Sequence, residues 1–216
     1  MQVSDIVTRV RAAIDELMAN DSGFLSASAD EKNLDEIIKD KIGYALQHII
    51  EVAPLDKLGT EMFSTLADSS HFSLDGLIGK LRLPSDLLRI VEARLSSWSQ
   101  YPLPESDTSQ VFLMQQDEYA RGSWDRPVNI LTYEGTERVL LMYSAKSSDD
   151  SLKFTYIAKP NISTSATTVN VPTRLEAALV YQVAGLTMVA FREDIAQSLF
   201  AIADRYIGLE NNETAA

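Results

Sequence analysis

Two histidines are the first residues in the chain that could carry catalysis. His48 lies in a stretch of helical periodicity with no second ligand four positions away, and His71 follows Ser70 in a polar segment. Adjacency in sequence does not place a serine hydroxyl on an imidazole, and the chain contains no Gly-x-Ser-x-Gly motif. We therefore interpret His48 as a structural residue and expect no Ser–His nucleophile at His71.

Two short motifs are similar to known sites only at first sight. The run Gly76–Lys80 (GLIGK) lacks the first glycine of a phosphate-binding loop, and Leu81 stands where serine or threonine is required. The pair Asp149–Asp150 could serve as paired carboxylates or cation ligands, but serines flank it in a turn-like segment. We expect a turn leading into a strand at the first motif and solvated turn residues at the second. A hydrolase would need carboxylates from distant parts of the sequence to converge in one cleft.

The loop 120–128 (ARGSWDRPV) has the most unusual content. Trp124 lies between Arg121 and Arg126. Trp and Arg are enriched at the energetic centres of protein interfaces, so the loop could anchor a partner protein. In the other interpretation, Trp124 covers the core of a sheet and the arginines pair with surface carboxylates. Neighbouring acidic residues argue against a nucleic-acid site, which needs clustered cations.

Composition narrows the possible functions. The chain has 216 residues, with 31 acidic and 19 basic side chains and a formal charge of −12. Such a chain is poorly suited to wrapping nucleic acid, although it could line a passage through which DNA slides. It contains no cysteine, which excludes disulfides, thiolate metal sites and cysteine nucleophiles. We expect no metal and no cofactor.

The segment Ala177–Phe191 carries fifteen residues without a charge. As a helix it spans about 22 Å, which is shorter than the ~30 Å hydrocarbon core of a bilayer. We therefore interpret it as a buried helix rather than a membrane anchor. One side is expected to pack on the N-terminal helices. The other side carries Tyr181, Gly185 and Met188, and we expect it to contact a partner subunit.

Hydrophobic periodicity predicts the elements that position these residues. Helices are expected over residues 3–19, from Asn33 to Pro54, around 61–66, from Thr173 through the uncharged segment, and over Ile195–Tyr206. Asn33 with Glu36, and Thr173 with Glu176, have the spacing of capping boxes. A strand is preferred for LLRIVEARLSSW, and YPLPESDTSQ is expected to be a loop. The pattern of residues 127–158 predicts a three-stranded antiparallel meander.

The order of helices, strands and helices predicts an α+β fold. The N- and C-terminal helices are expected to form one bundle, with an antiparallel β segment inserted between them. We place the discontinuous helical bundle at residues 1–70 and 170–210 and the inserted β domain at 76–160. Residues 211–216 are expected to form a mobile tail.

The order of motifs resembles that of the head–tail connector (adaptor) proteins of tailed bacteriophages. The similarity is to ring and tail-tubular subunits, particularly those of short-tailed crAss-like phages. The matching segments are SDIVTRVRAAIDEL, LDEIIKDKIGYALQHIIEVAP, LPSDLLRIVEARLSSW, RGSWDRPVNIL, the meander ending in YIAKP, and LEAALVYQVAGLTMVAFREDIAQSLFAIADRYI. The β segment is larger than in the smallest, wholly helical adaptors, which favours the ring proteins with inserted sheets.

The resemblance implies a structural subunit rather than an enzyme. It implies a homo-oligomeric ring, commonly a dodecamer, that lies below the portal protein and joins capsid to tail. Expected partners are the portal and other tail or ring proteins, with DNA passing through the channel without sequence-specific binding and no membrane. The protein would be made in the host bacterial cytoplasm and located in the virion. The alternative is a non-enzymatic ligand- or peptide-binding module that uses the β face and the Trp124 loop.

Overall fold

The computed structural model describes residues 1–18, 31–66, 71–117, 119–147, 150–162 and 166–209. The described residues form five α-helices and two β-sheets, which confirms the mixed α+β class. The tail expected to be mobile, residues 211–216, lies outside the described residues, as does Asp149.

The chain divides into two units. The first, here the helical unit, consists of Met1–Thr60 together with Lys159–Ala216. The second, here the β unit, is Glu61–Ala158 and contains both sheets. The chain therefore leaves the helical unit once, forms the β unit, and returns.

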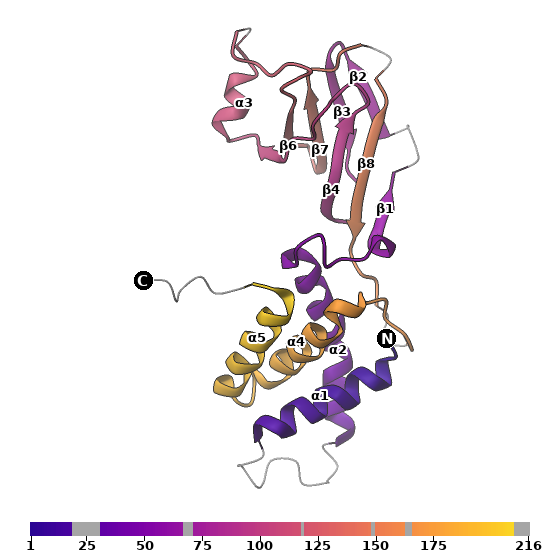
Figure 1. The fold of residues 1–216 in the computed structure, drawn as a ribbon, viewed down its shortest axis with the longest axis vertical. Helices are drawn as coiled ribbons and strands as arrows, with labels where there is room; N and C mark the ends of the chain where they lie inside the picture. The colour runs from indigo at the N-terminus through magenta and orange to yellow at the C-terminus, as the bar shows by residue number, and fades with distance from the viewer. Residues whose placement is uncertain (19–30, 67–70, 118, 148–149, 163–165, 210–216) are drawn as a thin grey trace. The chain divides into compact units, whose positions relative to one another are not determined.

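Helix α4 (Glu176–Met188) is the most buried element of the helical unit. It packs against α1 (Val3–Met18), α2 (Glu31–Val52) and α5 (Glu193–Ile207), as Figure 1 shows. Nine of its thirteen residues are buried, so it is covered on more than one side. The interpretation of the uncharged segment as a buried helix is therefore confirmed up to Met188, whereas Val189 and Phe191 lie beyond α4 and are exposed.

The helix ends agree with the sequence-based prediction at the C-terminus of α2 but differ from it at the N-termini of α2 and α4. Helix α2 stops at Val52, just before Pro54, as predicted from the ring that cannot continue a helix. It begins at Glu31, however, so Asn33 is inside the helix and is not its cap. Before α4 the chain forms a 3₁₀ turn, η3 (Thr173–Leu175), closed by Leu175 N–H to Pro172 O at 2.8 Å. The capping box predicted at Thr173 is wrong, because this backbone turn takes its place and no side chain caps α4.

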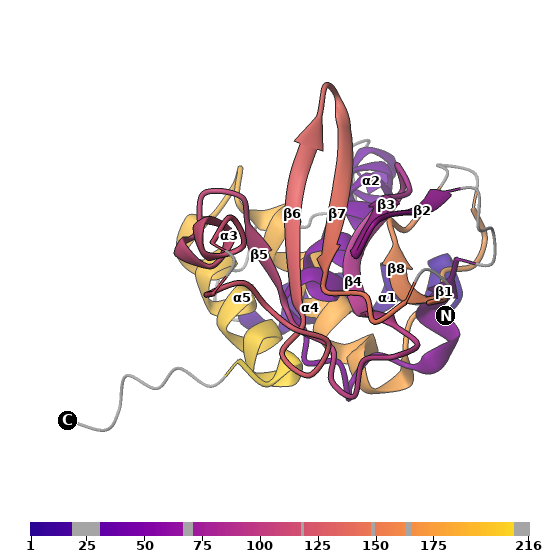
Figure 2. The same ribbon diagram turned by 90° about the horizontal axis from the view of Figure 1, so that it is seen from above.

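The β unit contains two sheets. In the first, the strand order is β1 (Phe63–Thr65), β8 (Leu152–Ala158), β4 (Leu87–Leu95). The second has the order β2 (Phe72–Asp75), β3 (Ile78–Arg82), β7 (Glu137–Tyr143), β6 (Val128–Glu134), β5 (Pro104–Ser106), which can be followed in Figure 2. The predicted strand at β4 and the turn before β3 are confirmed, with Gly76 at a φ of 60° in that turn.

The predicted three-stranded meander is only partly correct. Strands β6 and β7 form the expected antiparallel hairpin, but β8 pairs with β1 and β4 rather than with β7. The carboxylate of Asp150 lies where the chain changes sheet: it accepts hydrogen bonds from Ser97 Oγ at 2.7 Å and Ser96 Oγ at 3.2 Å, just beyond β4. These bonds fix the start of β8 beside the end of β4. Asp150 is 9% exposed, so the prediction of a solvated turn residue is wrong for it.

Two further segments differ from prediction. The helix expected around 61–66 is a 3₁₀ turn, η1 (Thr60–Met62), followed by strand β1, whose three residues pair with β8. The segment expected to be a loop contains β5, which pairs in parallel with β6. Both strands are only three residues long, too short for a period-2 pattern to indicate them.

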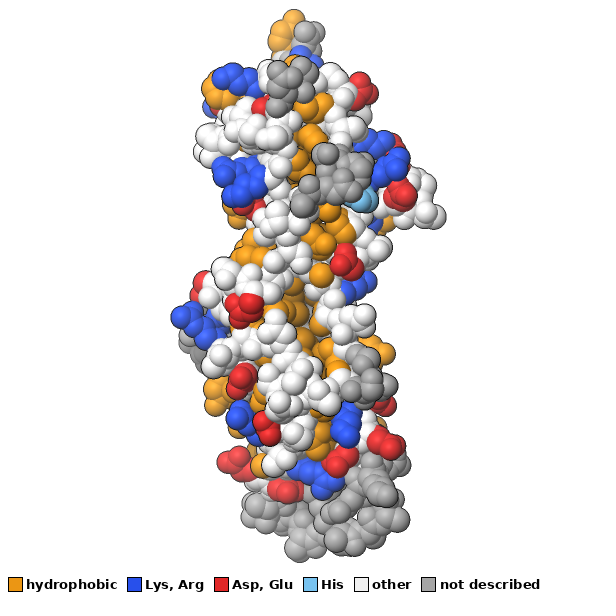
Figure 3. Space-filling model, turned by 90° about the vertical axis from the view of Figure 1, so that its right-hand side faces the viewer, with side chains coloured by type: hydrophobic (Ala, Val, Ile, Leu, Met, Phe, Trp, Pro, Cys, Tyr) orange, Lys and Arg blue, Asp and Glu red, His pale blue; other side chains and the backbone are white. Residues whose placement is uncertain are grey.

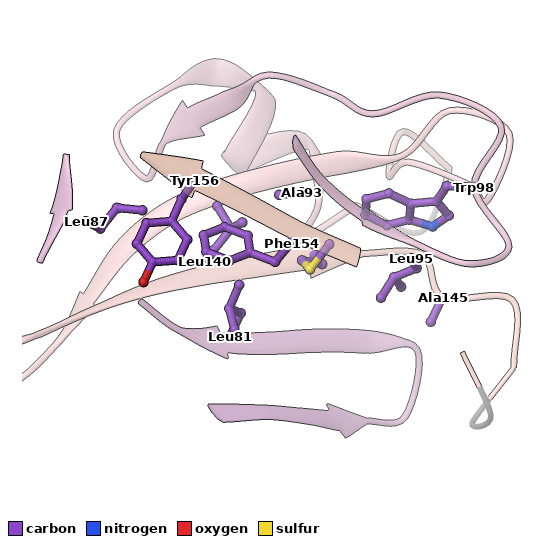
Figure 4. Close-up of a cluster of buried hydrophobic side chains, with 10 residues drawn as sticks. Leu81, Leu87, Ala93, Leu95, Trp98, Leu140, Ala145, Phe154 and Tyr156 are labelled. Carbon is purple, nitrogen blue, oxygen red and sulfur yellow. The ribbon is translucent and has the colours of Figure 1, made fainter. Parts of the chain in front are cut away.

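The core of the β unit lies between the two sheets. Leu81 and Leu140 from the five-stranded sheet meet Ala93 and Phe154 from the three-stranded sheet, as Figure 4 shows. Trp98 is buried at one end of this cluster, and its Nε1–H donates to the carbonyl oxygen of Ser144 at 3.0 Å. This bond connects the core to the end of β7, where the candidate site begins.

Candidate interaction site

The loop that carries Trp124 is fixed to the short helix α3 (Gln110–Met114). Helix α3 is capped by Ser109, whose side chain accepts from the N–H of Phe112 at 3.3 Å. Gln115, directly after the helix, donates from Nε2 to Val111 O at 2.8 Å, and its Oε1 accepts the N–H of Gly122 at 2.9 Å. One glutamine side chain thus holds the loop against the helix.

Trp124 occupies the second position of a tight turn. The N–H of Arg126 donates to Ser123 O at 2.9 Å, and the N–H of Ser123 donates to Arg126 O at 3.2 Å. Ser123 also hydrogen-bonds Asp125, and that bond, with backbone N–H groups and the adjacent Arg126, lowers the pKa of the Asp125 carboxyl. The turn therefore has Trp124 and Asp125 as its two central residues, with Ser123 and Arg126 closing it.

Position 122 requires glycine because the backbone of the turn passes close to it. A Cβ at position 122 would lie 2.8 Å from Arg126 O and 3.1 Å from Val128 Cγ2. The carbonyl oxygen of Gly122 accepts the Ser144 hydroxyl at 2.5 Å. Ser144 itself has a φ of 76°, a backbone conformation uncommon for residues other than glycine, and its N–H donates to Leu77 O at 3.1 Å.

Trp124 is exposed rather than packed on the sheet core. Its side chain is 47% exposed, and Lys146 Nζ lies 4.6 Å from the centre of its ring in a cation–π contact. Arg121 and Arg126 are exposed, and neither forms an ion pair with any carboxylate in the described residues. The interpretation in which Trp124 covers the core and the arginines pair with surface carboxylates is therefore not the observed arrangement.

Exposed large hydrophobic side chains are frequent in the stretch of sequence that ends at Trp124. Tyr119 is 97% exposed, the highest value among the large hydrophobic side chains of the described residues. Six such exposed side chains lie between positions 101 and 124: Tyr101, Leu103, Leu113, Met114, Tyr119 and Trp124. Two hollows adjoin the loop. One, of about 290 Å³, is lined by Leu77, Ile78, Arg121, Trp124 and Tyr143 among others; the other, of about 420 Å³, includes Met114, Tyr119 and Arg126. We give the name Trp124 surface to the six exposed side chains together with Arg121 and Arg126.

The predicted interface residues of α4 do not share one exposed face. Gly185 is buried against α5, where a Cβ would lie 2.5 Å from Phe200 Cε1, and Met188 is 2% exposed. Neither offers accessible surface to a neighbour, so the interface prediction for these two residues is corrected: α5 covers this side of α4. Tyr181 is half-buried and stacks on the exposed Tyr206, with ring centres 5.7 Å apart. Burial, then the nearby Tyr206 and Glu16, raise the pKa of Tyr181.

Sequence reasoning identified Arg121, Trp124 and Arg126 but missed most of the Trp124 surface. Leu113 and Met114 lie in the run VFLM, which suggested nothing because its helix has only five residues. Leu103 and Tyr101 lie in a proline-rich segment, where an apolar residue has no periodic pattern to reveal its environment. The sequence feature that could have identified these exposed residues is the presence of apolar side chains between prolines and short polar segments.

The described residues offer little for other kinds of site. His48 and His71 are both exposed. No group of three or more His, Asp or Glu side chains in the described part of the chain could hold a metal ion. Within that same part, every helix is too short or too polar to cross a bilayer. On the face drawn in Figure 3, acidic and basic side chains are interspersed, so cations do not gather there into one basic surface.

No model of a known protein family matches this chain, and no curated protein was found to be similar to it.

Proposed function

We propose that this chain is a structural subunit of a bacteriophage head–tail connector. Copies assemble into a ring, with twelve as the expected number, that lies below the portal and joins capsid to tail around the DNA channel. In this proposal the terminal helices form one bundle and the antiparallel β segment is inserted between them. The subunit is not an enzyme, is made in the bacterial cytoplasm and ends in the virion. The support from sequence is the order of motifs given above.

The observation that carries the proposal is the Trp124 surface. Exposed Tyr, Trp and Met side chains together with two arginines are residue types enriched in protein interfaces. Met114 and Tyr119 line one hollow beside the loop and Trp124 lines the other, so apolar side chains are exposed on both sides of Arg121, which lines both. The backbone beneath is held by Gln115, Ser144 and the turn at Ser123, so binding would order little that is not already ordered.

A ring requires a heterologous contact, in which one surface of a subunit meets a different surface of the next. The Trp124 surface is proposed as one side of that contact. Tyr181 and Tyr206 are proposed to belong to a second, separate contact surface. The net charge of −12 fits a channel that DNA must pass without being held, because phosphate groups are repelled by carboxylates.

The proposal is tested by Trp124→Ala and Arg126→Ala, with Tyr44→Ala as the matched control. Tyr44 is an exposed aromatic residue on α2, outside the Trp124 surface. We expect the first two variants to reduce ring assembly, measured by sedimentation of the purified chain and by particle yield, and the control to leave it unchanged. Assembly that survives both substitutions would remove the Trp124 surface from the interface.

A ligand- or peptide-binding module is the second candidate. The observation that favours it is the hollow of about 290 Å³ beside Trp124, which is large enough to hold a side chain. A chain that stays monomeric while binding a peptide there would support this function in place of the first.

A further inference from the structure

We infer that the hollow beside Trp124 binds an acidic peptide segment that carries one large apolar side chain. We call this hollow the Trp124 hollow; it has a volume of about 290 Å³ and includes Leu77, Ile78, Arg121, Trp124 and Tyr143 in its lining. The inference deepens the proposed function and rests on it, since it names the chemistry of the protein segment that meets the Trp124 surface.

The lining accounts for the apolar side chain. Leu77 and Ile78 belong to the β2–β3 turn and the start of β3, and both are exposed although they are aliphatic. Trp124 adds an aromatic ring from the facing loop, and Tyr143 adds another from the end of β7. A leucine or aromatic side chain placed among them would remove apolar surface from water on both sides of the contact.

Charge accounts for the acidic character of the segment. Arg121 lines the hollow, and Lys146 Nζ lies 4.6 Å from the centre of the Trp124 ring. No Asp or Glu is among the lining residues, although the chain as a whole is strongly acidic. A carboxylate beside the inserted apolar side chain would therefore meet Arg121 without a competing carboxylate in the lining, and Lys146 adds a second positive charge next to Trp124. A bidentate contact to Arg121 is the strongest form that this pairing could take.

The hollow is also held in shape before any ligand arrives. Its two sides are joined by the Ser144 hydroxyl on Gly122 O, and Ala145 N–H donates to Leu77 O at 2.8 Å. The carbonyl of Ser144 is fixed in turn by the indole N–H of Trp98. A site ordered in advance loses less conformational entropy on binding, which allows a short peptide to bind measurably.

A nucleic acid fits this surface less well. Phosphate binding needs a run of cations along the backbone path, whereas Arg121 is the one cation among the described residues that line the Trp124 hollow. The chemistry therefore favours a few carboxylates around one apolar side chain over a polyphosphate chain.

The test titrates the full chain with the synthetic peptide Gly-Asp-Glu-Leu-Glu-Asp-Gly and follows tryptophan emission. The peptide has no tryptophan, and of the two tryptophans in the chain Trp98 is buried whereas Trp124 is exposed. We expect a saturable shift of emission, and its absence in Trp124→Phe identifies Trp124 as the residue that reports binding. Arg121→Gln should weaken binding about tenfold, as expected for loss of a charged hydrogen-bonding partner. Arg82→Gln, the same change at an exposed arginine of β3, should have no effect.

The inference is overturned by equal binding of a peptide with serine in place of leucine, by equal binding of one with lysine in place of each acidic residue, or by absence of binding at millimolar concentration. Competition by a single-stranded oligonucleotide that is equally sensitive to Arg121→Gln would also overturn it. Failure here is distinguishable from failure of the proposed function. Rings that form while the hollow ignores every peptide contradict only the inference, and a monomer that binds the peptide contradicts only the ring.

Discussion

The hydroxyl of Ser144 donates a hydrogen bond to the carbonyl oxygen of Gly122 at 2.5 Å, joining the end of β7 to the turn that carries Trp124. Ser144 is the single non-glycine residue with positive φ in the described part of the chain. In this backbone conformation the N–H groups of Ser144 and Ala145 both donate to Leu77 O. The carbonyl oxygen of Ser144 accepts a hydrogen bond from the indole N–H of Trp98. One strained residue therefore connects the core, the β2–β3 turn and the exposed loop.

Substitution at Ser144 separates the hydrogen bond from the strain. Ser144→Ala loses the bond to Gly122 and keeps the unfavourable φ, so we expect it to lower the free energy of unfolding by about 1–2 kcal/mol. Ser144→Gly loses the same bond but adopts a positive φ without a Cβ, so its loss should be smaller. Urea unfolding followed by circular dichroism measures both. Equal losses would show that the conformation at position 144 carries no strain.

Gly185 and Gly43 form a matched pair of helical glycines. A Cβ at Gly185 would lie 2.5 Å from Phe200, whereas the nearest atom to a Cβ at Gly43 is 4.0 Å away, on Ile162. We expect Gly185→Ala to destabilise the helical unit by about 1–3 kcal/mol through overpacking. Gly43→Ala should stabilise it by about 0.5–1 kcal/mol, because alanine is the better helix former. Thermal unfolding of the two variants compares them directly, and a neutral Gly185→Ala would contradict the close α4–α5 contact.

Asp150 makes stability depend on pH at acid values. Burial alone would raise the pKa of its carboxyl, but hydrogen bonds from Ser97, from the N–H groups of Lys146 and Ser147, and from Ser96 lower it below its usual value. The stabilisation is therefore complete above the pKa of the unfolded carboxyl, about 4, and is lost as pH falls through the lower pKa of the folded state.

The variant Asp150→Asn should be less stable than the wild type at pH 7 by about 1–3 kcal/mol, since donors lose a charged acceptor. The difference between the two proteins should shrink as pH falls below about 4. Urea unfolding midpoints from pH 7 to pH 3 give this comparison, with Glu105→Gln as an exposed control. A difference that stayed constant with pH would mean that the charge of Asp150 does not matter.

The elements with long periodic patterns were predictable from sequence, and the short ones were not. The stripes of α1, α2 and α5, the alternation of β6 and β7, and the uncharged α4 each extend over enough residues to distinguish a helix from a strand. Strands β1 and β5 have three residues each, and their pairing is fixed by β8 and β6, far away in sequence. The pairing of β8 with β1 and β4, and the Asp150 contacts with Ser96 and Ser97 at its start, join residues more than fifty positions apart, which no local pattern reveals.

The candidate site was predictable only where composition was unusual. The sequence ARGSWDR drew attention to Arg121, Trp124 and Arg126 because tryptophan between arginines is uncommon in a surface loop. Gly185 and Met188 were assigned to the wrong environment, because a helix that is apolar on all sides does not reveal which neighbour covers each side. Here α5 covers Gly185 through Phe200, a contact set by tertiary packing rather than by helical periodicity.

Assembly of this chain through the Trp124 surface would determine its mass in solution. Light scattering of the purified chain, alone and with portal protein, measures that mass, and negative-stain images show its shape. We expect a mass that is a multiple of the 23.9 kDa subunit and ring-shaped particles, both lost in Trp124→Ala. A mass of one subunit at every concentration, with and without portal, would contradict the account.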